Sequence, residues 1–176
     1  MGLNILAWAA LAYFVGALPT DRVVARVPMG PGGPRINVAR LLTALLDFLK
    51  GVALVWLAAR YGWSAYALTA AGVAVVAGQS FPFWRGKYGD MGLWTAAGAL
   101  AVAAPAALLI GALVWAVVFG GLRRSGVATL VAASITPLSA ALLHYPPAAV
   151  LMALGVSLLV FASAASHRGD ASDLRQ

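Results

Sequence analysis

A succession of long apolar runs constrains this chain more than any other feature of its sequence. Short segments with charges, prolines or glycines separate the runs, which cover residues 3–19, 41–59, 65–82, 93–120, 126–143 and 147–166. About 20 apolar residues are needed to cross the hydrocarbon core of a bilayer. The sequence therefore predicts an all-α, polytopic membrane helix bundle. The first run lacks a basic leading region and a small-residue cleavage pattern, so we expect it to be a retained span.

The composition excludes an ordinary soluble domain. Hydrophobic residues make up 62% of the 176 positions, charged residues only 10%, and the mean hydropathy is +0.90. Soluble domains carry about 25% charged residues. The net charge of +7 does not indicate a nucleic-acid partner, because the cations lie in turns between apolar runs and not along one helix face. With no cysteine in the chain, thiolate metal sites and disulfides are excluded as well.

The run over 93–120 is ambiguous by length. At about 1.5 Å per residue it is too long for one upright span and short for two. The choice between one span and two rests on the basic residues of the connecting segments and the C-terminal tail. These are Arg22, Arg26, Arg35, Arg40, Arg85, Lys87, Arg123, Arg124, Arg168 and Arg175. With the N-terminus outside, all of these lie inside only if 93–120 crosses twice, as a hairpin of short helices turning near Ala104 and Pro105. We therefore expect about seven spans, in a single transmembrane domain over 1–166 with a short cytoplasmic tail at 167–176.

Polar residues gather on the predicted cytoplasmic side. The Pro- and Gly-rich first loop cannot be helical until about Asn37, which is a plausible N-cap for the next helix. A helix N-terminus flanked by Arg35 and Arg40 is suited to an anion. The alternative is a basic loop that meets lipid headgroups. His167 and Arg168, at the end of the last span, lie on the same side, where the alternative is a simple topology anchor.

Asp47 and Lys50 lie inside the second apolar run, in the sequence LLDFLKG. Ionisable groups at membrane depth are costly unless they pair or face a polar cavity. Their three-residue spacing places both on one helix face. A mutual ion pair that only orients the helix and a role in substrate binding are equally compatible with this pattern.

The segment from Gly78 to Gly98 is too polar to span a membrane. It reads GQSFPFWRGKYGDMGLWTAAG and combines five glycines with Arg85 and Lys87 between two apolar runs. Glycines that permit close backbone approach, together with cations before a helix, indicate a loop that could hold an anion. No Walker-type loop, zinc spacing or nucleophile elbow occurs in the chain, so we expect no cofactor.

Taken in order, these segments resemble the bacterial glycerol-3-phosphate acyltransferases that use acyl phosphate as donor. YFVGALPTDRVVAR is similar to that family's opening segment, LLDFLKG to its Asp-x-x-Lys-Gly segment, and HRGDASDL to its closing His-Arg segment. The Gly78–Gly98 segment aligns with its glycine-rich loop without a gap. In this loop Gln79 replaces a histidine and Asp90 a glycine, while Tyr88 and Met91 stand where the family has lysines.

The resemblance implies transfer of an acyl group from acyl phosphate to glycerol 3-phosphate, giving 1-acyl-glycerol 3-phosphate. It also implies a multi-pass protein of the bacterial inner membrane, with the active-site loops and the C-terminus cytoplasmic. The catalytic residues that it implies are His167 and Lys87. The implied substrate-binding residues are Asn37, Arg40, Lys50, Arg85, Gly86, Gly89, Gly92, Thr95, Arg123 and Arg168.

Two other functions remain open at this point. The replacements at Gln79, Asp90 and Met91 are compatible with a catalytically impaired paralogue that binds lipid phosphate or a partner enzyme. A small transporter with Asp47 and Lys50 midway is the weaker alternative, because the sequence contains no inverted repeat.

Overall fold

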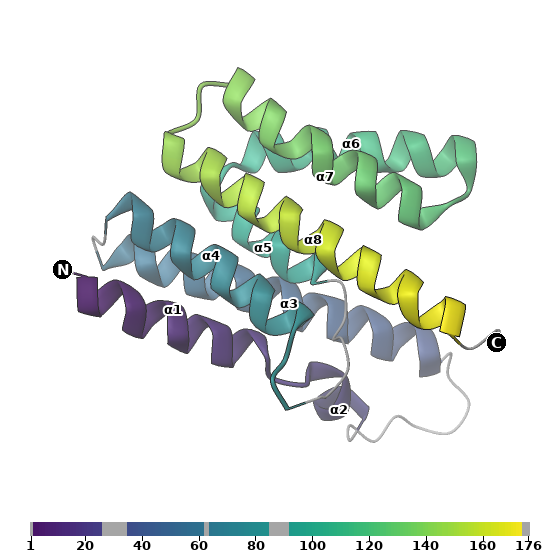
Figure 1. The fold of residues 1–176 in the computed structure, drawn as a ribbon, viewed down its shortest axis with the longest axis horizontal. Helices are drawn as coiled ribbons and strands as arrows, with labels where there is room; N and C mark the ends of the chain where they lie inside the picture. Colours follow the sequence, from purple (N-terminus) through teal and green to yellow (C-terminus); the bar gives the residue numbers. More distant parts are fainter. Residues whose placement is uncertain (1, 26–34, 62–63, 85–91, 174–176) are drawn as a thin grey trace.

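The computed structural model describes residues 2–25, 35–61, 64–84 and 92–173. In these ranges the chain forms helices joined by short connections (Figure 1). The helices are α1 (Gly2–Gly16), α2 (Thr20–Ala25), α3 (Arg35–Arg60), α4 (Ala65–Ser80), α5 (Leu93–Ala103), α6 (Pro105–Leu122), α7 (Ser125–Leu142) and α8 (Pro147–Asp173).

The helices pack as pairs that α8 joins. The main pairs are α1 with α4, α3 with α5, and α6 with α7, while α8 contacts both α4 and α7. In Figure 1 the α6–α7 pair lies on one side of α8 and the helices α1, α3 and α4 lie on the other. The buried core consists mostly of small and β-branched residues such as Ala71, Val75, Ala99 and Val156, with Met152 as its largest side chain.

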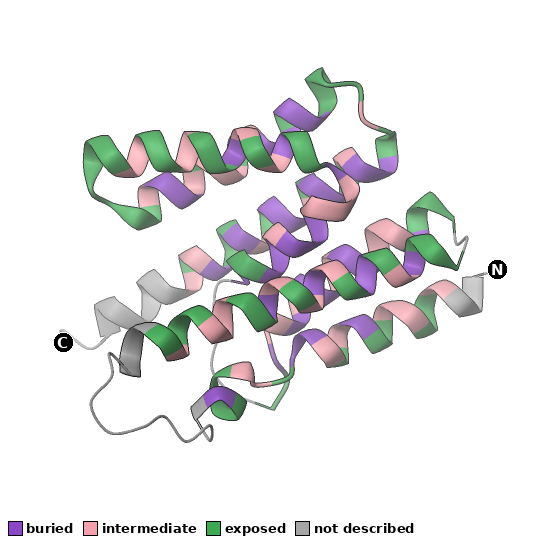
Figure 2. Ribbon diagram, turned by 180° about the vertical axis from the view of Figure 1, so that it is seen from behind, coloured by how far each residue is buried: buried purple, intermediate pink, exposed green. Residues whose placement is uncertain are grey.

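The outer surface is that of a protein in lipid. Exposed residues are spread over the outer side of the bundle (Figure 2), and large apolar residues are among them: Leu41, Leu109 and Leu158 are each more than two-thirds exposed. In the described part of the chain, four helices are long and apolar enough to span a membrane: Val38–Arg60, Pro105–Leu122, Ser125–Leu142 and Pro147–Ser166. Shorter apolar helices cover Ile5–Gly16, Ala65–Ser80 and Leu93–Ala103. The predicted polytopic helix bundle is confirmed.

The predicted break within 93–120 is confirmed at Ala104. This residue leaves the helical conformation, with φ −151° and ψ 67°, and Pro105 opens α6. Proline suits a first helical position because its missing N–H would have no partner there. The two helices run in opposite directions (Figure 1), and only α5 is short, because α6 is long enough to span a membrane. They pack mainly against other helices, however, α5 on α3 and α6 on α7.

Glycines bring two helix pairs into backbone contact. A Cβ atom on Gly78 would collide with the carbonyl of Tyr13 in α1, and one on Gly98 with the carbonyl of Phe48 in α3. Close approach through small residues is a common way to pack helices in a membrane. Both glycines were expected in the anion-binding segment, but α4 continues through Ser80 and α5 begins at Leu93. Their role in the structure is helix packing.

The structure differs from the sequence-based description at three further places. Helix α2 was not predicted, because a six-residue helix leaves little periodicity to detect. Asn37 is not the N-cap of the second long helix, since α3 begins at Arg35. The segment expected to be a short tail begins inside α8, whose backbone stays helical to Asp173.

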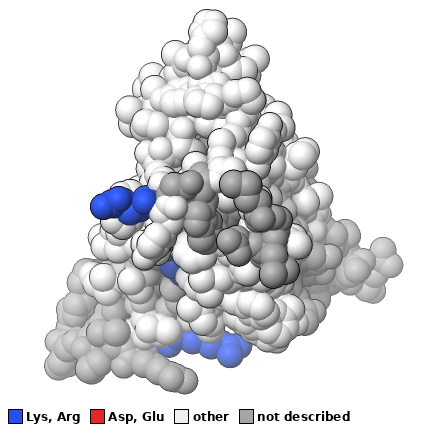
Figure 3. Space-filling model, turned by 90° about the vertical axis from the view of Figure 1, so that its left-hand side faces the viewer, with Lys and Arg blue, Asp and Glu red and all other residues white. Residues whose placement is uncertain are grey.

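The helix ends and connections that carry or adjoin most of the basic residues lie at one end of the bundle. The ends of α4 and α8, the beginnings of α3 and α5, and the α6–α7 turn lie in the right-hand half of Figure 1. Arg123 and Arg124 form that turn, whereas Arg60 ends α3 on the other side. Figure 3 shows the opposite, left-hand end, where most described atoms belong to uncharged residues.

Candidate functional site

The first part of the site is an ion pair on α3. The Nζ atom of Lys50 lies 2.9 Å from Oδ1 of Asp47. The two residues are three apart on one helix and therefore project from the same face. Asp47 is only 2% exposed, so its charge depends on partners within the protein.

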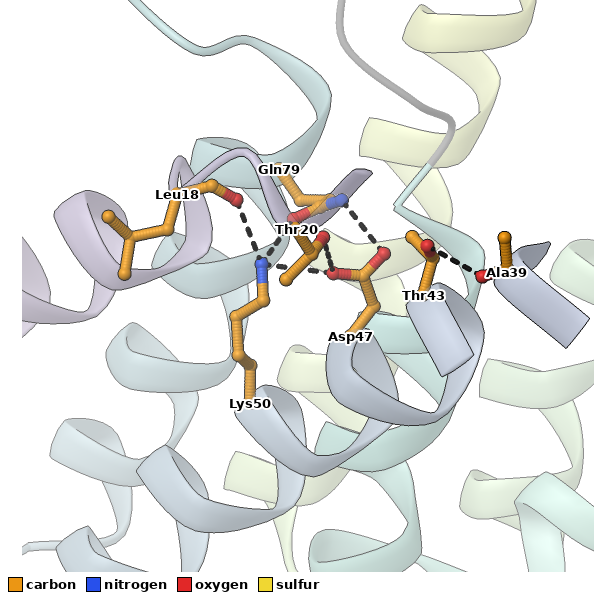
Figure 4. A network of polar contacts seen from close by, with 7 residues as sticks. All are labelled: Leu18, Thr20, Ala39, Thr43, Asp47, Lys50 and Gln79. Atoms are coloured by element: carbon orange, nitrogen blue, oxygen red, sulfur yellow. Dashed lines mark hydrogen bonds and ion pairs between the residues drawn. The ribbon is translucent and has the colours of Figure 1, made fainter. Parts of the chain in front are cut away.

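Two segments outside α3, the α1–α2 corner and α4, supply further partners (Figure 4). The hydroxyl of Thr20 donates to Asp47 Oδ1 at 2.6 Å, and the Gln79 amide donates to Oδ2 at 3.1 Å. Lys50 Nζ donates to the carbonyl of Leu18 at 3.1 Å and to Oε1 of Gln79 at 3.0 Å. We call these five residues, Leu18, Thr20, Asp47, Lys50 and Gln79, the clasp.

The clasp uses the full hydrogen-bonding capacity of Lys50. An ammonium has three N–H donors, and here they face Asp47, Leu18 and Gln79. This geometry favours the ion-pair alternative over direct substrate binding by Lys50. The clasp also ties the α1–α2 corner and the end of α4 to the middle of α3.

Two adjoining cavities lie beside the clasp and share Asp21, Thr43 and Asp47. We call them together the polar pocket. The cavity of about 210 Å³ reaches Gln79, Pro82 and Trp84, and the cavity of about 440 Å³ reaches Arg40 and Trp94. Arg40 supplies the larger cavity with a guanidinium that can bind an anion. The other charged residues that line it, Asp47 and Asp21, are carboxylates, and Lys50 pairs with the first of them.

An apolar groove of about 240 Å³ lies between α5, α6, α7 and α8. Its lining includes Leu93, Trp94, Leu100, Leu108, Ala112, Trp115 and Val160. Trp115 donates its indole N–H to the hydroxyl of Thr129 at 3.1 Å, which satisfies one of the few polar groups there. Trp94 borders both this groove and the cavity with Arg40. Apolar and polar surfaces therefore meet at the first turn of α5.

The predicted site residues are distributed over several places. Arg40 lines the polar pocket. Gly92 precedes α5 with φ +63°, a conformation that disfavours other residues, and a Cβ there would lie 2.7 Å from Ser80 Oγ. Thr95 is fully buried and its carbonyl packs against Gly51. Arg123 is exposed in the α6–α7 turn. Neither Thr95 nor Arg123 lines the polar pocket or the groove.

The remaining predicted residues are placed only in part. Asn37 lies in the first turn of α3, and His167 and Arg168 lie near the end of α8, at the same end of the bundle. Arg85, Gly86, Lys87 and Gly89 lie outside the described residues.

Sequence reasoning missed the roles of Thr20, Thr43, Gln79 and Trp94. Thr20 follows Pro19 and precedes Asp21, a pattern that marks a helix start and could have drawn attention to this corner. Gln79 was treated as a departure from the family's histidine, whereas the structure gives its amide two partners. Nothing in the sequence distinguishes Trp94 from a membrane-interface tryptophan.

The lipid-facing helix bundle, with a polar pocket and an apolar groove meeting at one end, defines an integral membrane protein equipped for an amphiphilic ligand. The family model described as glycerol-3-phosphate acyltransferase matches residues 36–176. The chain belongs to the glycerol-3-phosphate acyltransferase family.

Individual relatives are similar in sequence to this protein over nearly the whole chain. The glycerol-3-phosphate acyltransferase of Burkholderia multivorans is 34% identical, covering 98% of this chain and 88% of its own length. That of Brucella anthropi is 30% identical, and the match covers 92% of this chain and 87% of the relative.

Two crystal structures of PlsY, described as an integral membrane glycerol 3-phosphate acyltransferase, are also similar. The glycerol 3-phosphate form has a TM-score of 0.77 and 26% identity, covering 97% of this chain and 92% of PlsY. The lysophosphatidic acid form has a TM-score of 0.79 and 27% identity, and the match covers 97% of this chain and 91% of PlsY.

Proposed function

We propose that this protein transfers an acyl group from acyl phosphate to glycerol 3-phosphate and so produces 1-acyl-glycerol 3-phosphate for phospholipid synthesis. The observation that carries the proposal, beside family membership, is the position of Trp94 between the Arg40 cavity and the apolar groove. A site of this kind suits a donor with one hydrocarbon chain and one anionic head.

The two surfaces supply different parts of the binding energy. Each methylene group buried in the groove contributes about 0.8 kcal/mol. A hydrogen bond from Arg40 to a phosphate contributes roughly 1.5–3 kcal/mol because the partners are charged. Binding both substrates side by side converts a bimolecular reaction into an intramolecular one.

The chemistry needs little from a protein base. A glycerol hydroxyl oxygen attacks the acyl carbonyl carbon, the new ester bond forms, and the bond from that carbon to the phosphate oxygen breaks. Phosphate leaves with the electron pair, and a substrate phosphate group can take up the hydroxyl proton. The protein then has to orient the reactants and stabilise the oxyanion with N–H donors and cations.

The residue roles follow from the resemblance and from positions in the fold. We assign Lys87 and His167 to the reacting groups, with His167 hydrogen-bonding the substrate. The phosphate-binding set comprises Asn37, Arg40, Arg85 and Arg168, and the backbone amides at Gly86, Gly89 and Gly92 complete it. Arg123, which lines neither cavity nor the groove, belongs to this set by the resemblance alone. Lys50 and Thr95, also candidates from the sequence, are better assigned to structural roles because of their contacts in the clasp and in the α3–α5 interface.

The catalytic interpretation is favoured over the impaired paralogue, since the relatives across 98% of the chain are named as acyltransferases. We further propose that the protein resides in the cytoplasmic membrane of a bacterium, with the basic end of the bundle inside. The positive-inside rule supports this orientation.

The decisive experiment uses purified protein in phospholipid vesicles. Acyl phosphate and glycerol 3-phosphate should together yield inorganic phosphate and 1-acyl-glycerol 3-phosphate, identified by mass spectrometry. Omitting glycerol 3-phosphate gives the background hydrolysis, and an acyl thioester in place of acyl phosphate tests the donor. The Burkholderia multivorans relative serves as a positive control. No product from this protein, in vesicles where the relative is active, would contradict the proposal.

A further inference from the structure

Gln79 occupies the centre of the clasp. Its amide N–H donates to Asp47 Oδ2 at 3.1 Å, and its carbonyl oxygen accepts from Lys50 Nζ at 3.0 Å (Figure 4). One side chain on α4 therefore contacts both members of the ion pair on α3.

An amide is well matched to this position. It offers a donor and an acceptor on one planar group and carries no charge at any accessible pH. A carboxylate at residue 79 would oppose Asp47, and an ammonium would oppose Lys50. Since Asp47 is 2% exposed, water is poorly placed to replace a lost partner.

The same amide borders the polar pocket. Gln79 and Asp47 line its smaller cavity together with Thr20 and Trp84, and Asp47 also lines the larger cavity that reaches Arg40. A change at Gln79 would thus remove one hydrogen-bond partner from Asp47 and one from Lys50, the two residues that also hold Thr20 and Leu18 at the corner.

We propose that Gln79 is a positioning residue. Its uncharged amide locks the Leu18–Thr20 corner against α3 and so keeps the wall of the polar pocket in one geometry across the pH range. The role of Gln79 in holding the Leu18–Thr20 corner against α3 follows from the hydrogen bonds alone, whereas its effect on turnover rests on the proposed function.

The surroundings of Gln79 define the pH test. The titratable or charged groups among the described side chains of neighbouring elements are Arg40, Asp47, Lys50 and Arg60 on α3, Asp21 and Arg22 on α2, and Tyr13 on α1. The described side chains of α5 and α8, which also pack on α4, include none. A free imidazole titrates near pH 6.5, so histidine in place of Gln79 brings a titratable group to this position. Neutral imidazole still has one donor and one acceptor, whereas the protonated ring has two donors and faces the Lys50 ammonium.

The first test reports the pocket geometry without catalysis. Because the chain has no cysteine, Thr43→Cys introduces a single thiol on the wall shared by both cavities. Its labelling rate by a small maleimide is measured in vesicles, alone and combined with a second substitution. Each combined rate is divided by that of Thr43→Cys alone at the same pH, which removes the titration of the thiol.

Gln79→Leu should change the relative rate by about tenfold or more at every pH, the scale of one lost charge-assisted hydrogen bond. Gln79→His should leave it near one at about pH 8 and shift it toward the Gln79→Leu value at about pH 5.5. The matched control is Thr69→Val, which removes the 2.7 Å hydrogen bond to Ala148 O elsewhere on α4. This control should leave the rate near one.

An unchanged labelling rate in Gln79→Leu would overturn the proposal, and so would a pH-independent rate in Gln79→His. If Gln79→Leu fails to insert into the membrane, Gln79→His at the two pH values still decides the question. In the active enzyme, Gln79→His should raise KM for glycerol 3-phosphate on acidification, relative to unaltered protein, with a smaller change in kcat. Absence of turnover in unaltered protein would contradict the proposed function but leave the labelling test intact.

Discussion

Asp47 and Lys50 form a buried ion pair, with Oδ1 and Nζ 2.9 Å apart on one face of α3. Thr20, Leu18 and Gln79 satisfy the remaining hydrogen bonds of both groups. The pair is the point at which α3, α4 and the α1–α2 corner meet, and its loss should therefore affect the whole bundle.

Lys50→Met should destabilise the protein by about 3–5 kcal/mol, because it leaves the carboxylate of Asp47 buried without its cation. Asp47→Asn/Lys50→Met should recover much of this loss, since both charges are then absent. Denaturation in mixed micelles measures the free energy of unfolding. Equal stability of Lys50→Met and the double variant would contradict the coupling.

Gly98→Val should disrupt the α3–α5 interface, because the first added carbon already collides with the carbonyl of Phe48. Overpacking typically costs about 1–3 kcal/mol, and rigid backbone as the obstacle places this variant at the upper end or beyond. Gly120→Val in α6 is the matched control, since nothing lies within 4 Å of its Cβ position. Similar unfolding midpoints for the two variants would show that the close approach is unimportant.

Arg40→Ala should raise KM for the phosphate-bearing substrates by about 10- to 150-fold, the effect of one lost charge-assisted contact. Arg40→Lys should be intermediate, because an ammonium keeps the charge without the forked geometry. Arg60→Ala, at the opposite end of the bundle, is the control and should leave KM unchanged. Steady-state rates, determined over a range of substrate concentrations at two ionic strengths, give the KM of each variant. A normal KM in Arg40→Ala would remove Arg40 from the site.

Ala112→Leu should shift the preference toward shorter acyl chains, because Ala112 lines the apolar groove. A few methylene groups in an apolar pocket change discrimination by about 10-fold or more. Competition between acyl phosphates of different length measures kcat/KM directly. Ala106→Leu, on the face of α6 that carries the exposed Leu109 and Leu113 and not the groove residues, should keep the original preference. Identical profiles in the two variants would place the acyl chain elsewhere.

Arg124→Cys should be inaccessible to a membrane-impermeant maleimide in intact spheroplasts and become labelled after permeabilisation. Tyr61→Cys should be labelled in both conditions, because residue 61 follows α3 at the other end of the bundle. The absence of native cysteines makes each signal specific. Labelling of both variants from the same side would contradict the seven-span arrangement, and a reversed pattern would invert the orientation.

The helices themselves were predictable because their signal is local. Apolar length and breakers such as Pro105 act within one segment, and the helix ends follow them closely at α6, α7 and the start of α4. The short helix α2 and the start of α3 at Arg35 were missed. Helix α2 is too short to leave a detectable hydrophobic period. Helix α3 begins two residues before Asn37, where the Pro- and Gly-rich segment had led us to expect its start.

The site was predictable only in part, because its contacts join residues that are distant in the chain. Gln79 meets Asp47 across 32 positions, and no motif in LLDFLKG specifies that partner. The glycines of the Gly78–Gly98 segment illustrate the same limit. Gly92 stays at a turn with positive φ, while Gly78 and Gly98 serve helix packing.

The membrane-embedded helical class, the helix break near Ala104 and the family resemblance could be predicted from the sequence, since hydropathy and motif spacing are local properties of the chain. Helix packing was needed to establish that Asp47 and Lys50 pair with each other, that Gln79 bridges them, and that Trp94 joins the polar pocket to the apolar groove. Those relationships arise where separate helices pack together, because burial leaves polar groups only the partners that packing brings within reach.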